Sequence, residues 1–144
     1  MMLKPYHLYK ILQQLFSNYP GISSVFMEGC VTYSNEAKMK SLGVKKETLD
    51  VYGAVSDKCA KEMASGVAAR YNTNIGIATT GIAGPDGGTD EKPVGLVYVA
   101  VDSDNYSDVK KLLLSRGFSE ERELVRYLAS SHALYMGLTA TKRL

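Results

Sequence analysis

The stretch 81–93 constrains the fold most, because it can form neither a helix nor a strand. It contains four glycines and two prolines, which favour turns and interrupt both helices and β-ladders. The β-branched run 75–80 precedes it and the apolar run 94–101 follows it. The sequence therefore predicts two strands joined by a long loop, and a loop of this kind often carries function.

Other stretches of the chain carry the signals of helices and further strands. Apolar residues at spacings of three and four, Ser or Asn caps and terminating glycines predict helices over 6–17, 35–41, 47–52, 57–71 and 119–139. Runs rich in β-branched and other apolar residues predict strands over 30–33 and 109–115, besides 75–80 and 94–101. Helices interleaved with strands indicate a single α/β domain over 1–144, with a mixed sheet of about four strands and helices packed on it.

Composition and charge exclude several classes of function. The 17 basic and 15 acidic residues give a net charge of +2, too small and dispersed for a nucleic-acid-binding surface. No apolar run approaches the roughly 18 residues of a membrane helix. Two histidines without a Cys-x-x-Cys pair cannot assemble the usual zinc sites. Cys30 and Cys59 lie in apolar company, so we expect reduced, buried thiols and a location in the cytoplasm.

The beginning of the glycine-rich loop is a candidate anion-binding segment. Thr80, Gly81, Ile82, Ala83 and Gly84 follow directly from a predicted strand. Glycines let backbone N–H groups approach an anion closely, and the threonine hydroxyl can add a contact. The spacing matches neither a P-loop nor a dinucleotide fingerprint. The same composition is equally typical of a surface excursion with tight turns.

Tyr33 and Lys38 form a second candidate site, at the junction of a predicted strand and a predicted helix. Lys38 falls in the first turn of that helix, where the helix dipole and partial burial both disfavour an ammonium. A lysine whose pKa is lowered in this way can act as a base. The alternative is purely structural, with an exposed lysine and a core tyrosine whose hydroxyl reaches the rim.

Three motifs in one order resemble a known family. They are Val-Thr-Tyr-Ser-Asn-Glu-Ala-Lys at 31–38, Gly-Ala-Val-Ser at 53–56, and Thr-Gly-Ile-Ala-Gly-Pro-Asp-Gly-Gly at 80–88 with Glu-Lys-Pro-Val-Gly at 91–95. This pattern closely resembles the CinA C-terminal domain family, whose members are nicotinamide-nucleotide amidases. The resemblance implies a three-layer domain that converts nicotinamide mononucleotide to nicotinate mononucleotide and ammonia in pyridine-nucleotide recycling. It implies no metal or cofactor, and a homo-oligomer.

The resemblance also implies a Ser-Lys-Tyr mechanism, in which the serine attacks, the lysine takes its proton and the tyrosine assists. Tyr33 and Lys38 match the last two roles. The family's serine lies in a Glu-Ser-Cys-Thr-Gly-Gly motif, and a gapless alignment places Tyr6 at the serine's position. The five residues before Tyr6 are too few to supply the family's first strand and its turn. We therefore expect this strand and the nucleophile segment to be missing, which leaves a sheet edge to be covered.

Three interpretations follow from the absent motif. An active amidase would need another nucleophile, with Ser34 or Thr80 the hydroxyls near the proposed pocket, although a displaced nucleophile rarely keeps its attack geometry. A noncatalytic member would bind a nucleotide or a protein through the retained loop. A shortened product would have a parent that carries the motif. We expect the chain as written to have little or no amidase activity.

Overall fold

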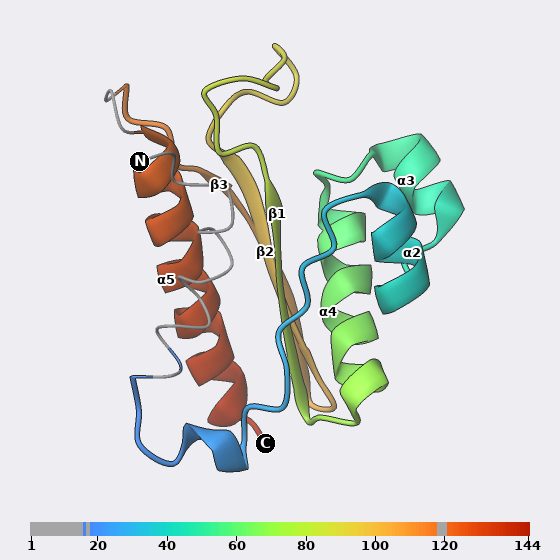
Figure 1. Cartoon of the computed structure of the whole chain (residues 1–144), viewed down its shortest axis with the longest axis vertical. Coiled ribbons are helices and arrows are strands. Elements are labelled where there is room, and N and C mark those ends of the chain that lie inside the picture. Colours follow the sequence, from blue (N-terminus) through green and yellow to red (C-terminus); the bar gives the residue numbers. More distant parts are fainter. Residues whose placement is uncertain (1–15, 17, 118–120) are drawn as a thin grey trace, which may run out of the picture.

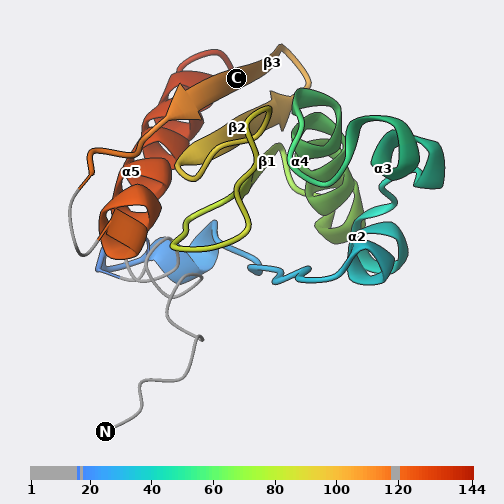
Figure 2. The ribbon, with the colours of Figure 1, turned by 90° about the horizontal axis from the view of Figure 1, so that it is seen from above.

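The computed structural model describes Phe16 and residues 18–117 and 121–144. These residues form three layers, with a sheet between one long helix and a group of shorter helices (Figure 1). Helix α5 (Glu121–Thr141) covers one face of the sheet, and helix α4 (Asp57–Tyr71) covers the other. The remaining helical elements are η1 (Ile22–Ser24), α2 (Asn35–Leu42) and α3 (Lys46–Tyr52), of which the last two lie on the α4 side (Figure 2).

The described sheet has three strands in the order β1 (Ile75–Gly81), β2 (Leu96–Ser103) and β3 (Tyr106–Leu113). Both pairs are antiparallel. The middle strand β2 is buried on both faces because alternate side chains point to opposite sides of a strand. Val97, Val99 and Val101 pack in a cluster with α5, while Ala100 packs in a second cluster with α4. Two cores therefore share one strand.

The predicted α/β class is confirmed, but two details of the sheet differ among the described residues. The run 30–33 is not a strand, so the described sheet has three strands instead of about four, and it is antiparallel instead of mixed. Strand propensity expresses how well a side chain fits a packed, pleated surface, but here Val31 and Tyr33 are 48% and 77% exposed. The segment 25–33 runs past the β1 side of the sheet without joining a ladder (Figure 2).

The other predicted elements are confirmed, with shifted ends. Strand β2 begins two residues later than predicted because Gly95 has a φ of 88° and ends the preceding turn. Helix α4 has the predicted limits, since the Ser56 hydroxyl accepts from the Cys59 N–H at its start and Asn72 adopts a left-handed conformation at its end. The predicted helix over 6–17 lies outside the described residues except for Phe16.

Helix α4 approaches two of its neighbours, α2 and β1, through glycine. A Cβ on Gly66 would overlap the carbonyl oxygen of Leu42 at the end of α2. A Cβ on Gly76 of β1 would overlap the carbonyl oxygen of Ala64 on α4. These contacts set how near α2 and β1 come to α4, and they therefore fix the place of α2, which carries one of the candidate site residues.

The variant Gly66→Ala tests this close approach, because steric overlap and helix propensity change the stability in opposite directions. Alanine in a helix interior should stabilise the protein by about 1 kcal/mol relative to glycine, whereas overlap with a packed backbone should destabilise it by about 1–3 kcal/mol. We expect a net loss in urea unfolding. The exposed neighbour Ser65→Ala is the matched control and should leave stability nearly unchanged. A more stable Gly66→Ala protein would contradict the packing of α2 on α4.

Candidate functional site

Lys38 is held in the first turn of α2 with its amine inside the protein. The Ser34 hydroxyl begins the helix by accepting from the Ala37 N–H at 3.0 Å. Lys38 is only 7% exposed. Its Nζ donates to the Thr32 carbonyl at 2.7 Å and to the Tyr33 carbonyl at 3.3 Å. The extended segment before the helix thus folds back over the amine of its own lysine.

The surroundings of the amine favour its neutral form. Burial lowers the pKa of Lys38 from its ordinary value, and the nearby Cys59 thiol opposes this effect more weakly. Within residues 18–117 and 121–144, no carboxylate forms a salt bridge with Nζ. A neutral amine has two N–H groups and one lone pair, and the two carbonyls match the two N–H groups. The lone pair is then available to accept a proton.

Tyr33 meets Lys38 through its backbone and not through its ring. Its carbonyl accepts from Nζ, whereas its side chain is 77% exposed. The alternative of an exposed lysine and a core tyrosine is therefore wrong, because Lys38 is buried and Tyr33 is exposed. The assisting role of the Tyr33 hydroxyl stays a prediction. Tyr6, at the aligned position of the family's serine, lies outside the described residues.

Thr80 and Ser34, the two candidate replacement nucleophiles, already use their hydroxyls in the fold. The Thr80 hydroxyl, at the end of β1, donates to the Ala54 carbonyl at 2.7 Å. Ser34 caps α2. Thr32 is different, because its buried hydroxyl has no hydrogen-bond partner among the described residues. Sequence reasoning missed Thr32, whose only signal was its position six residues before Lys38.

The glycine-rich loop starts from a hydrogen-bonded stem. The Ile82 N–H donates to the Leu96 carbonyl at 2.9 Å, and the Gly95 N–H donates to the Ile82 carbonyl at 2.7 Å. Gly81 cannot carry a side chain, since a Cβ there would lie 2.7 Å from the Leu96 carbonyl oxygen. Ala83 packs against the cluster under α5. The first part of the loop is therefore held in place, and anion binding by its N–H groups stays a prediction.

Two cations hold the loop from opposite sides of the domain. Arg122 of α5 donates to the carbonyl of Gly84, a buried residue with a φ of 81°. Lys92, near the far end of the loop, donates to the Tyr52 carbonyl at the end of α3 at 2.6 Å. Neither cation was singled out from the sequence. The dipeptide Lys92-Pro93 beside the glycines was the available signal.

Cys59 lies within electrostatic reach of both Lys38 and Lys92. Cys59 is fully buried in the first turn of α4, and both cysteines are free thiols, as predicted. The expected burial is wrong for Cys30, which is only partly buried because its segment joins no strand ladder. Burial raises the pKa of the Cys59 thiol, while Lys38 and Lys92 both act to lower it and Glu62 to raise it. Both amines therefore act electrostatically on the same buried sulfur.

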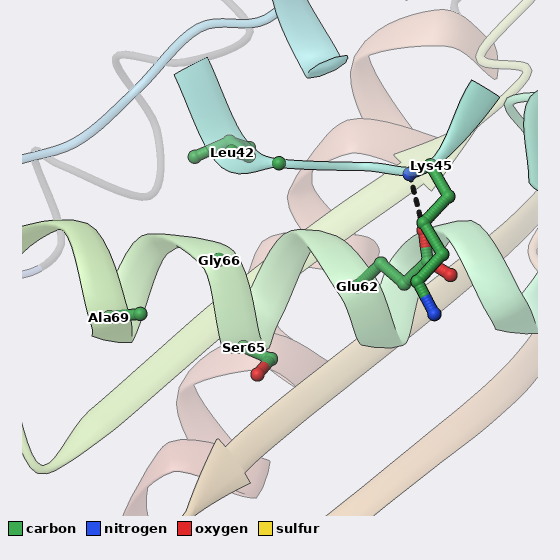
Figure 3. A pocket seen from close by; sticks show the side chains of 7 residues that line it. Leu42, Lys45, Glu62, Ser65, Gly66 and Ala69 are labelled. Atoms are coloured by element: carbon green, nitrogen blue, oxygen red, sulfur yellow. Dashed lines mark hydrogen bonds between the residues drawn. The ribbon is translucent and has the colours of Figure 1, made fainter. Parts of the chain in front are cut away.

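A shallow hollow of about 310 Å³ lies apart from these residues, between the end of α2 and α4 (Figure 3). Glu62 is its acidic lining residue, and both carboxylate oxygens are engaged, by the Lys45 N–H at 2.8 Å and by the Thr48 hydroxyl at 2.7 Å. None of the predicted site residues lines this hollow. It is a gap between packed helices rather than an extension of the candidate site.

The described residues offer no evident metal site and no membrane helix. Within 18–117 and 121–144, no three His, Cys, Asp or Glu side chains are grouped so that they could hold a metal ion. No described helix combines the length and the apolar character needed to cross a membrane. What the residues around Lys38 offer chemically is an amine, a free hydroxyl and backbone carbonyls.

Comparison with known sequences supports the family resemblance that the motifs indicated. Residues 11–140 match the CinA C-terminal domain family. A putative competence-damage inducible protein of Clostridium perfringens is 64% identical over 109 residues, which are 76% of this chain and 26% of that protein. One from Clostridioides difficile is 58% identical over 117 residues, 81% of this chain and 27% of its own length. The chain thus spans about a quarter of these curated relatives.

Solved structures agree with the fold. The competence/damage inducible protein CihA from Agrobacterium tumefaciens matches with a TM-score of 0.86 at 36% identity, over 93% of this chain and 80% of that one. A CinA superfamily protein from Escherichia coli matches with a TM-score of 0.81 at 33% identity, over 91% and 74%. The three-layer α/β fold is therefore shared, and the chain belongs to the CinA C-terminal domain family.

Proposed function

We propose that this domain carries the proton-accepting part of an amidohydrolase site for nicotinamide mononucleotide. The observation that carries the proposal is the buried Lys38 amine, whose N–H groups are occupied by two carbonyls and whose pKa is lowered by burial. A lysine in this state can do the work that histidine does in a catalytic triad. The resemblance to nicotinamide-nucleotide amidases supplies the substrate.

The proposed reaction needs a hydroxyl that can attack the substrate. In the first step a hydroxyl oxygen bonds to the carboxamide carbon while its proton passes to the Lys38 lone pair. The protonated amine then gives that proton to the departing nitrogen, which leaves as ammonia, and water hydrolyses the ester. No Glu-Ser-Cys-Thr-Gly-Gly motif occurs in the 144 residues. The hydroxyls of Ser34 and Thr80 are engaged in the fold, and the Thr32 hydroxyl is buried, so we propose that this chain alone is catalytically impaired.

A noncatalytic role in nucleotide binding is the second candidate. Its support is the loop itself, which Arg122 and Lys92 tie to helices on opposite faces of the sheet. A loop fixed before the ligand arrives binds with a smaller loss of conformational entropy. The buried Thr32 hydroxyl adds a free hydrogen-bonding group near Lys38. This role needs no nucleophile.

The ammonia assay decides between an impaired and an active amidase. We expect the purified chain, given nicotinamide mononucleotide, to release ammonia no faster than its Lys38→Ala variant. A relative that carries the full motif serves as the positive control. Ammonia release by the unaltered chain that Lys38→Ala abolishes would show that another hydroxyl attacks, and would contradict the proposed impairment.

The buried amine predicts a pH dependence of stability. The pKa of Lys38 is lower in the folded state than in the unfolded state, where it is near the ordinary value of 10.5. Between the two values the unfolded chain holds the proton and the folded chain does not. The free energy of unfolding should therefore rise with pH in that window, by at most about 1.4 kcal/mol per pH unit. Below the folded pKa the contribution is constant.

Urea unfolding at several pH values from 7 to 10 measures this effect as a difference between the unaltered protein and Lys38→Met. We expect the unaltered protein to gain stability relative to Lys38→Met as the pH rises. The exposed Lys61→Met variant is the control, and its difference should stay flat. A difference for Lys38→Met that is flat or falls with pH would mean that the amine stays protonated.

The binding role predicts sensitivity at one glycine of the loop. Gly84 and Gly87 both have a positive φ, of 81° and 90°, so alanine strains both. A Cβ on Gly84 would also lie 2.6 Å from Val94, whereas on Gly87 the nearest atom is 3.9 Å away. In calorimetric titration with nicotinamide mononucleotide, we expect Gly84→Ala to weaken binding about tenfold more than Gly87→Ala. Equal affinities would contradict binding through this part of the loop.

A further inference from the structure

We infer that Lys92 is a positioning residue, which sets the glycine-rich loop against the 53–56 turn and so fixes the loop relative to Lys38. The structural part of this inference stands on its own contacts. Its consequence for ligand affinity rests on the proposed function. The argument starts at the turn between α3 and α4, which lies beside the start of α4 and its buried Cys59.

Three successive carbonyls of this region each accept from a side chain. The Tyr52 carbonyl accepts from Lys92 at 2.6 Å, the Gly53 carbonyl from the Ser56 hydroxyl at 2.9 Å, and the Ala54 carbonyl from the Thr80 hydroxyl at 2.7 Å. The donors come from the loop, from the turn itself and from the end of β1. The turn is therefore tied to both ends of the strand-to-loop segment.

Gly53 makes room for the Lys92 amine. It ends α3 with a φ of 77°, a conformation that side chains rarely adopt. A Cβ at this position would lie 2.9 Å from Lys92 Nζ. The ammonium also meets the C-terminal carbonyls of a helix, where a positive charge is favoured. The C-terminus of α3 and Gly53 thus together accommodate the Lys92 amine.

The contact of Lys92 with Tyr52 also restrains the loop, because the backbone of Lys92 is itself hydrogen-bonded within the loop. The Thr89 N–H donates to the Lys92 carbonyl at 2.9 Å, and the Lys92 N–H donates to the Thr89 hydroxyl at 3.0 Å. This reciprocal pair closes the turn 89–92. On the other side of the loop, Arg122 holds Gly84. Removing Lys92 should therefore free the part of the loop that follows Gly84, while the stem at Ile82 stays bonded.

The contact also relates the loop to Lys38. Cys59 lies within electrostatic reach of both amines, which approach it from α2 and from the loop. The Cys59 N–H is bonded to Ser56, a member of the same turn. A shift of the 53–56 turn would thus change the distance between the loop and the lysine that the proposed reaction uses.

Amide hydrogen exchange followed by mass spectrometry tests the positioning directly. In Lys92→Met, which keeps the aliphatic stem, we expect exchange about tenfold faster in 53–56 and 86–93, with β2 unchanged. Lys92→Arg should restore the protection, because its guanidinium can donate to the same carbonyl. Lys61→Met is the control with an exposed lysine. Gly53→Ala should also lose the protection, because its methyl group would displace the Lys92 amine from the Tyr52 carbonyl.

The outcomes separate positioning from general stability and from the proposed function. If exchange in Lys92→Met is faster everywhere, β2 included, Lys92 only stabilises the fold. If exchange is unchanged, the contact does not restrain the loop or the turn. Either result would overturn the inference. With nicotinamide mononucleotide as the probe, we expect a Kd about tenfold higher in Lys92→Met and restored in Lys92→Arg. If the unaltered protein binds no nucleotide, the binding role fails, while the exchange result still decides the positioning role.

Discussion

The Lys38 amine holds together the part of the structure on which the candidate site depends. Its hydrogen bonds to Thr32 and Tyr33 fasten the segment before α2, which joins no strand ladder along 25–33. The same burial that makes these bonds strong makes a positive charge costly. Structure and chemistry are therefore coupled at one atom, because the amine that ties the chain down is also the group whose pKa is lowered by burial.

Close packing around α4 fixes what lies on either side of that amine. Gly66 and Gly76 let α2 and β1 approach the helix backbone, and this approach brings the start of α2 near Cys59. From the opposite direction, Thr80 and Lys92 tie the end of β1 and the glycine-rich loop to the turn before α4. The loop and Lys38 are thus both positioned relative to helix α4, although the contacts that hold them come from separate motifs.

The sequence predicted the elements better than it predicted the orientation of the site residues. Caps and glycines placed α2, α3 and α4 within a residue or two, since these signals act locally. The run 30–33 failed as a strand because a ladder needs a neighbour, which local propensity does not supply. The burial predicted for Lys38 is confirmed. The exposure of Tyr33 and the bonds of Lys92 and Thr80 depend on tertiary packing, so spacing alone could not have shown them.

The proposed reaction depends on the protonation state of the Lys38 amine, which is the central claim. The direct measurement is NMR titration of the lysine side chains, with carbon and nitrogen shifts next to Nζ followed from pH 6 to 11 and the Lys38 signal assigned by its loss in Lys38→Met. We predict a Lys38 pKa clearly below 10.5, while exposed lysines such as Lys61 titrate near that value. A Lys38 signal that titrates together with Lys61 would contradict the account.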